Sequence, residues 1–195
     1  MCDFETTVYE GQEHTEVWAS ASVELFTEDV HIFHSIAEQF DYFIGLNTNV
    51  CCFYHNLKFD GTFWLDYLLV KLHMEQACEK IGDEPNQVAW LKEKDMKNNS
   101  FKYSISDRGQ WYTIIIKKNN HFIEIRDSLK LLPFSVKRIG ESFKTKHKKL
   151  EMEYKGFRYA GCDITDEEKE YIANDVLVVK EALEFMLAND WIVRE

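Results

Sequence analysis

CDFETT at residues 2–7 opens the chain with apolar and acidic side chains in alternation. Successive side chains of a β-strand point to opposite faces, so a strand over 2–8 places Asp3 and Glu5 on the same face. Two carboxylates then project toward one place. An acidic pair of this kind, taken alone, is more often a solvated strand face than a metal site.

A third carboxylate stands in FYHNLKFDG, residues 53–61. The apolar run 50–55 predicts a buried strand, and the turn-forming residues 56–61 predict the handover from that strand to a helix. Asp60 is therefore expected at an open position where a site can form. In isolation, Asp60 before Gly61 is also typical of an ordinary turn.

A fourth carboxylate lies in YIAND, residues 171–175, within a stretch whose apolar residues recur at helical spacing. The pattern predicts a helix over 165–190, with Thr165 as its cap and Glu168 completing a capping box. Tyr171 and Asp175 are four residues apart and share one helical face.

The four acids suit a pair of hard divalent cations, because Mg²⁺ and Mn²⁺ prefer carboxylate and water oxygens. Two such ions activate a water molecule and stabilise the departing oxygen in an in-line displacement at phosphorus. The sequence therefore predicts phosphodiester hydrolysis at a site built from Asp3, Glu5, Asp60 and Asp175.

The order of these segments resembles the three exonuclease motifs of the protein-primed family B DNA polymerases of bacteriophages, which belong to the DEDD class with tyrosine. RGQWY at 108–112 and DSLKLLPFSVKRI at 127–139 are similar to further segments of that family, in the same order. The resemblance implies an α/β fold, a ribonuclease H-like mixed sheet flanked by helices, that forms one 3′-5′ exonuclease domain over 1–195. The palm, fingers and thumb of a polymerase are not expected in it, and 78–100 is expected to be an insertion.

The resemblance also implies roles for single residues. The metal ligands would be Asp3, Glu5, Asp60 and Asp175, with Tyr171 orienting the attacking water as the fifth catalytic residue. Contacts to single-stranded DNA would come from Thr6, Asn56, Phe59, Ser128, Leu129, Lys149 and Tyr154. His55 and Phe63 match positions linked to strand displacement and to a terminal protein. The implied partners are a DNA 3′ end, the rest of a polymerase and a terminal protein, and the implied cofactors are two Mg²⁺ or Mn²⁺ ions.

Several of these residues also have a plainer interpretation. Phe59 could be a core aromatic beneath its loop, and His55 a loop histidine with ordinary partners. The functional interpretation of Phe59 is a flat surface on which an unpaired base stacks regardless of its identity.

Composition limits the class of protein. At 195 residues the chain fits one domain, and it has neither a long apolar run nor a signal peptide, which predicts a cytoplasmic protein with no membrane partner. The resemblance implies that the cell is a bacterial or phage-infected host. Its five cysteines show no C-x-x-C pair, which argues against a zinc site or a disulfide framework.

The net charge of −11 is unusual for a protein that binds nucleic acid. Six Lys or Arg residues against Glu141 between Lys137 and Lys149 form a local basic strip. This strip is either a track for the DNA backbone or a solvated face.

The remaining pattern is α/β. Further strands are expected at 16–26, 29–33, 50–54, 101–106, 110–117 and 121–127, with 118–120 turning the last two into a hairpin. Further helices are expected at 35–43, 61–80 and 135–143, and a short one at 88–94. Two alternatives to the DNA exonuclease stay open: a DEDD exoribonuclease acting on short RNA, and a catalytically silent module that binds DNA ends or proteins.

Overall fold

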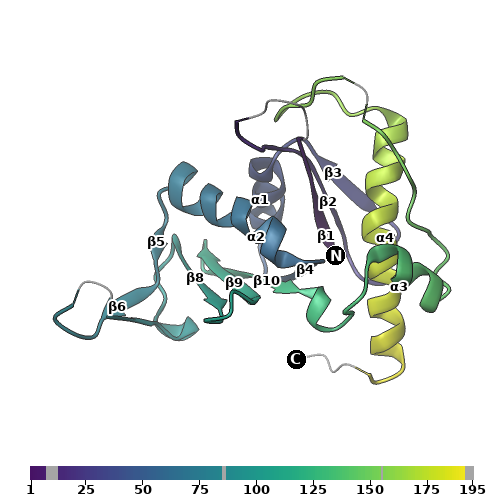
Figure 1. Ribbon diagram of the computed structural model, residues 1–195. Coiled ribbons are helices and arrows are strands. Elements are labelled where there is room, and N and C mark those ends of the chain that lie inside the picture. The colour runs from purple at the N-terminus through teal and green to yellow at the C-terminus, as the bar shows by residue number, and fades with distance from the viewer. Residues whose placement is uncertain (8–12, 85–86, 155, 192–195) are drawn as a thin grey trace. The chain divides into compact units, whose positions relative to one another are not determined.

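The computed structural model describes residues 1–7, 13–84, 87–154 and 156–191 (Figure 1). The chain divides into two compact units. The first contains residues 1–39 and 128–195, and the second contains residues 40–127. Helix α1 (Ile36–Gly45) begins in the first unit and ends in the second.

The first unit is built on three antiparallel strands in the order β3-β2-β1, namely β1 (Cys2–Thr6), β2 (Val17–Val23) and β3 (Val30–Phe33). Helix α4 (Asp166–Ala188) packs against all three strands, and α3 (Val136–Ser142) packs against α4 (Figure 1). The main chain of Met1 and Val23 pairs at the start of β1, where the amino group of Met1 donates to the Val23 carbonyl at 2.7 Å.

Strand β1 confirms the alternation read from the sequence. Cys2 and Phe4 are buried, whereas Asp3 and Glu5 are half-buried on the opposite face. A register shift between Glu5 and Thr6 marks a β-bulge, a feature that commonly re-aims side chains next to functional sites. The expected strand reaches residue 8, which lies outside the described residues.

Helix α4 confirms the helix expected over 165–190. The Thr165 side chain accepts from the Glu168 N–H, and the Glu168 side chain accepts from the Thr165 N–H, so the predicted capping box is present. One face of the helix is apolar and fully buried, and it includes Ile172 and Val176. This face fixes the rotation of α4 and hence the direction in which Asp175 points.

The second unit contains a five-stranded mixed sheet in the order β4-β10-β9-β8-β5. Its strands are β4 (Val50–Tyr54), β5 (Glu75–Gln76), β8 (Ser100–Ile105), β9 (Trp111–Lys118) and β10 (His121–Asp127). β10 runs parallel to β4, and β8, β9 and β10 form an antiparallel meander. The turn expected at 118–120 is present, with Asn119 and Asn120 both at positive φ.

Helix α2 (Leu57–Asp66) starts earlier than the expected 61–80 helix and continues into a π-helical turn, η1 (Tyr67–Lys71). Asn56 precedes it in the left-handed conformation, which asparagine tolerates better than most residues. Asp60 therefore lies in the first turn of the helix, not in a turn before it. Leu57, Asp60, Gly61 and Trp64 form its buried face.

Gly61 is required at its position by packing. A Cβ atom there would lie 2.7 Å from two ring carbons of Trp111, closer than side chains approach one another. The HNLKFDG and RGQWY segments thus meet in the second unit, where α2 packs on β9.

The expected short helix at 88–94 is wrong. β6 (Cys78–Lys80) pairs antiparallel with β7 (Val88–Trp90) as a separate ribbon, and a single 3₁₀ turn, η2 (Glu93–Asp95), follows. The Trp90 ring packs edge-on against Tyr103 of β8, with ring centroids 4.8 Å apart. Strand pairing and this aromatic contact outweigh the helical propensity of the segment. Its status as an insertion stays a prediction.

Two further findings bear on the expected class of protein. The five cysteines are free thiols. Within the described ranges, no helix combines the length and apolar character needed to cross a bilayer.

Candidate metal and nucleic-acid site

Three of the four predicted acids meet in the first unit. Carboxylate oxygens of Asp3, Glu5 and Asp175 lie within 4.8 Å of one another, and they form the one potential metal-binding group of this kind in the part of the chain that the structure describes. β1 supplies two of the three carboxylates and α4 supplies the third. Because α4 packs against β1, the two acids of the strand and the acid of the helix lie close together.

Lys149 connects the acids to Tyr171. Its ammonium donates to the Tyr171 hydroxyl at 2.9 Å and forms an ion pair with Asp175 Oδ2. The same nitrogen lies 4.7 Å from the centre of the Tyr171 ring. Tyr171 and Asp175 thus share one face of α4, as their spacing predicted.

Tyr154 occupies the other side of the acidic group. Its hydroxyl donates to Glu5 Oε2 at 2.6 Å. Its ring packs edge-on against Trp18 at 4.9 Å and against Tyr171 at 5.8 Å between centroids. Since Trp18 is fully buried in β2, the aromatic contacts fix the orientation of Tyr154 and, through it, that of Glu5.

The site perturbs the acidities of its members. Burial raises the pKa of Glu5 to about 7, against the opposing hydrogen bond from Tyr154 and with a further contribution from Asp175. Burial also raises the pKa of Asp175, although Lys149 opposes the shift. Burial acts to lower the pKa of Lys149, but the hydrogen bond and charge of Asp175 outweigh it and raise that pKa. Lys149 therefore stays protonated throughout the physiological range.

These residues fit a divalent cation. Three carboxylates offer the hard oxygen donors that Mg²⁺ and Mn²⁺ prefer. Within the described part of the chain, Asp175 Oδ1 is buried and meets no hydrogen-bond partner, while Oδ2 carries the contact to Lys149. A buried, unsatisfied carboxylate oxygen costs free energy unless a cation or donor meets it, so Oδ1 is suited to a metal ion.

The second unit contains Asp60, Asn56, Phe59, Phe63 and His55. Asp60 is buried in the first turn of α2, and its place in the metal site stays a prediction. Phe59 is 48% exposed, which excludes the core alternative for this ring, and it packs edge-on against Phe63 at 5.5 Å. Asn56 is exposed, and its backbone N–H donates to Asp127 Oδ1 at 3.1 Å. His55 is half-buried. The roles predicted for these four also stay predictions.

The other predicted DNA contacts lie in the first unit. Thr6 is half-buried immediately after Glu5. Ser128 and Leu129 begin the 3₁₀ turn η3 (Ser128–Lys130), where Ser128 is fully buried and Leu129 is half-buried. Their contacts with a DNA strand remain predictions.

Sequence reasoning missed two partly buried ion pairs that involve α4. His147 Nδ1 contacts Glu181 of α4, and Arg158 contacts Glu168 while lying 5.4 Å from the Trp18 ring. The partners of the first pair are 34 residues apart and those of the second are 10 apart, so no local spacing reveals them. An isolated histidine within a run of lysines was the one available signal.

The basic strip is partly used inside the protein. Lys148 donates to the Gly140 carbonyl at 2.8 Å, Lys149 belongs to the acidic site, and Lys146 forms an exposed pair with Glu28 at 3.4 Å. Lys146 and Lys148 are exposed, as a solvated face predicts, whereas Lys149 is half-buried in the site. The DNA track stays a prediction.

Comparisons with known proteins agree with this architecture. The sequence profile of DNA polymerase type B, organellar and viral, matches residues 45–161 of the 195. The DNA polymerases of Bacillus phages PZA and phi29 are each 36% identical over 190 residues, covering 93% of this chain and 29% of their own length. The DNA polymerase of Streptococcus phage Cp-1 is 29% identical over 157 residues, 73% of this chain and 22% of that protein.

Solved structures give the same result. Phi29 DNA polymerase complexed with single-stranded DNA matches with a TM-score of 0.76 and 31% identity, covering 99% of this chain and 32% of that one. Its complex with primer-template DNA and incoming nucleotides matches with a TM-score of 0.76 and 30% identity, covering 97% and 30%. The resemblance and the mixed α/β fold are thereby confirmed, and the chain spans less than a third of the length of these relatives. The chain belongs to the organellar and viral family of type B DNA polymerases.

Proposed function

We propose that this chain is the 3′-5′ exonuclease domain of a type B DNA polymerase, which hydrolyses phosphodiester bonds at single-stranded DNA 3′ ends and serves in proofreading. The observation that carries the proposal is the convergence of Asp3, Glu5 and Asp175 within 4.8 Å, with Lys149 and Tyr154 bonded to two of them. Asp60 is proposed as the fourth carboxylate.

The chemistry proposed for the acids is metal-assisted. When bound, two Mg²⁺ or Mn²⁺ ions supply an activated water and charge neutralisation at the phosphate. Asp3, Glu5, Asp60 and Asp175 would hold them.

The other groups of the site are proposed to position the reacting groups and to neutralise the charge of the phosphate. The Lys149 ammonium stands beside Asp175, whose hydrogen bond and charge raise the pKa of Lys149, and its positive charge can offset the negative charge of the scissile phosphate. The Tyr171 hydroxyl, already bonded to Lys149, orients the attacking water. Tyr154 keeps Glu5 in one orientation through its 2.6 Å hydrogen bond. Catalysis is then mostly geometry and electrostatics.

The proposed substrate is an unpaired strand. The exposed ring of Phe59 offers a stacking surface that tolerates any base, as sequence-independent trimming requires. Thr6, Asn56, Ser128 and Leu129 complete the proposed contacts, and His55 with Phe63 are proposed to meet a terminal protein. The relative solved with single-stranded DNA supports this choice of substrate. The site of action is proposed to be the cytoplasm of the host cell.

The test follows a 5′-labelled single-stranded DNA oligonucleotide on a sequencing gel in the presence of Mn²⁺. The wild-type chain should give a ladder that shortens from the 3′ end. Asp3→Ala and Asp175→Ala should abolish the ladder, because each removes a carboxylate of the site.

The matched control is Glu170→Gln, which removes an exposed carboxylate of α4 next to Tyr171 and should leave the ladder unchanged. Equal cleavage by wild type, Asp3→Ala and Asp175→Ala would overturn the proposal. Binding of 3′ ends without any cleavage would favour the silent module instead.

A further inference from the structure

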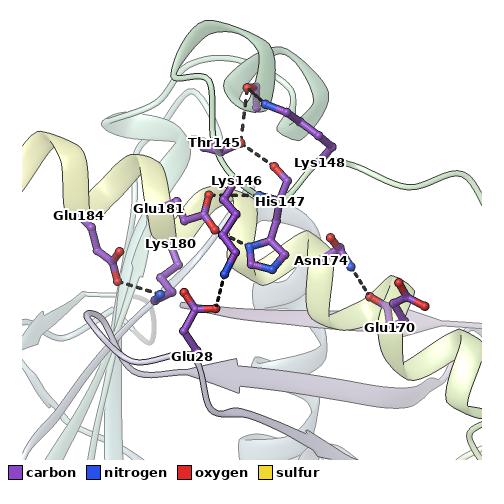
Figure 2. Close-up of polar contacts among 11 residues, drawn as sticks. Glu28, Thr145, Lys146, His147, Lys148, Glu170, Asn174, Lys180, Glu181 and Glu184 are labelled. Atoms are coloured by element: carbon purple, nitrogen blue, oxygen red, sulfur yellow. Dashed lines mark hydrogen bonds and ion pairs between the residues drawn. The ribbon is translucent and has the colours of Figure 1, made fainter.

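The segment Thr145–Lys149, here called the strap, follows α3 and ends at Lys149, which contacts Asp175 and Tyr171 of the candidate site. Figure 2 shows its residues Thr145 to Lys148 beside α4. At the start of the strap, the Thr145 hydroxyl donates to the His147 carbonyl at 2.7 Å. The backbone N–H of Thr145 donates to the Gly140 carbonyl at 3.2 Å. Lys148 reaches the same carbonyl at 2.8 Å. The two bonds to the Gly140 carbonyl tie the strap to the C-terminal half of α3.

A second attachment ties the strap to α4. His147 Nδ1 contacts Glu181 Oε1, and the His147 backbone N–H donates to Glu181 Oε2 at 3.3 Å (Figure 2). Both oxygens of one carboxylate are thus engaged by one residue. The side chains are only 22% and 14% exposed, so water competes less here than at the exposed Lys146–Glu28 pair.

The attachments run in opposite directions along strap and helix. His147 meets Glu181, and Lys149, two residues later, meets Asp175 and Tyr171 earlier in α4. Six residues of helix rise about 9 Å, whereas two extended residues span at most about 7 Å. The Lys149 side chain therefore extends along α4 to reach Asp175 and Tyr171. The position of its ammonium depends on where His147 attaches the strap to α4.

We propose that His147 and Glu181 are positioning residues, which hold the strap on α4 so that the Lys149 ammonium stands between Asp175 and Tyr171. Their effect passes through Lys149, and its catalytic consequence rests on the function proposed above.

The first experiment reads the position of Lys149 without any catalysis. The Lys149 ammonium is held by Asp175 and the Tyr171 hydroxyl, and this position shields it from a reagent in solution. In the wild-type chain, Lys149 should react slowly with an amine-acylating reagent, as followed by peptide mass spectrometry. His147→Ala and Glu181→Ala should raise its labelling rate about tenfold, because a strap released from α4 leaves the Lys149 amine exposed to the reagent more often.

Two variants separate positioning from general loosening. In His147→Asn the amide nitrogen takes nearly the place of Nδ1 and can still donate to Glu181, so protection of Lys149 should be restored. Glu28→Gln weakens the exposed anchor of the same strap and should leave the labelling of Lys149 unchanged. Circular dichroism on every variant checks that the chain is folded.

The second experiment measures cleavage of single-stranded DNA. His147→Ala should lower kcat about tenfold with little change in KM, since misplacement of a catalytic group affects the transition state most. Adding His147→Ala to Lys149→Ala should cause no further loss, because the two changes remove the same interaction.

The outcomes are distinct from those of the proposed function. A wild-type chain without nuclease activity, but with labelling that responds to His147→Ala, would refute the exonuclease and leave the positioning intact. Unchanged Lys149 labelling in folded His147→Ala and Glu181→Ala, or a full additive loss in the double variant, would overturn the positioning role.

Discussion

The hydroxyl of Tyr154 donates a 2.6 Å hydrogen bond to Glu5, whose pKa burial raises to about 7. A carboxyl group with a raised pKa holds its proton in the folded state over a range in which the unfolded chain has lost it. Ionising Glu5 in the folded protein therefore costs free energy of folding, and a cation bound to the carboxylate would offset this cost.

The first prediction concerns stability against pH in EDTA. The pKa of Glu5 is about 7 when folded and 4.5 as a free side chain. Between these values the folded state binds more protons, so the free energy of unfolding falls as pH rises, by at most about 3 kcal/mol. Urea unfolding from pH 5 to pH 8 should show this fall, and Glu5→Gln should flatten it. An identical slope in Glu5→Gln would contradict the assignment.

The second prediction concerns the hydrogen bond itself. Tyr154→Phe removes a donor that lowers the pKa of Glu5, so the pKa should rise further. Cation binding requires the carboxylate, and the pH at which Mn²⁺ binding is half-maximal should move upward. Tyr159→Phe removes the hydroxyl of an exposed tyrosine five residues away and should leave the profile in place. A common profile for the two variants would argue against the role of Tyr154.

The third prediction separates metal binding from cleavage. Lys149→Ala removes an ammonium that competes with cations for Asp175, so Mn²⁺ should bind more tightly by calorimetry. The same change removes the positive charge proposed to face the phosphate, and single-turnover cleavage should fall by about 10²-fold. Weaker Mn²⁺ binding together with undiminished cleavage would contradict both statements.

The fourth prediction tests the packing of the second unit. Gly61→Ala places a Cβ 2.7 Å from the Trp111 ring and should lower the free energy of unfolding by about 1–3 kcal/mol. Gly45→Ala adds a methyl group where nothing lies within 4 Å, and it should be nearly neutral. Equal urea midpoints for the two variants would show that Trp111 can move aside.

The same glycine illustrates what the sequence could and could not predict. The strand alternation of Asp3 and Glu5 and the capping box of α4 are local sequence patterns, and the structure confirms both. In the sequence, Gly61 indicates a turn, and the expected helix therefore starts at 61 although α2 starts at Leu57. The true reason for the glycine is its packing against a tryptophan 50 residues later, which no local pattern reveals.

Long-range pairing explains the other differences. The sequence pattern of 88–94 predicts a helix, but Val88–Trp90 forms a strand because it pairs with Cys78–Lys80. The contact of His147 with Glu181 joins residues 34 apart, and no periodicity encodes it. The carboxylates of the candidate site could be predicted from the sequence because they lie in recognisable segments. The contacts that support them could not, because they depend on tertiary structure.

Titration with Mn²⁺ by isothermal calorimetry tests the central claim, that Asp3, Glu5 and Asp175 form a metal centre, most directly. At pH 8, where Glu5 is ionised, the wild-type chain should bind two ions, and Asp175→Asn should lose or greatly weaken this binding while Glu170→Gln retains it. Identical binding by wild type and Asp175→Asn would contradict the account.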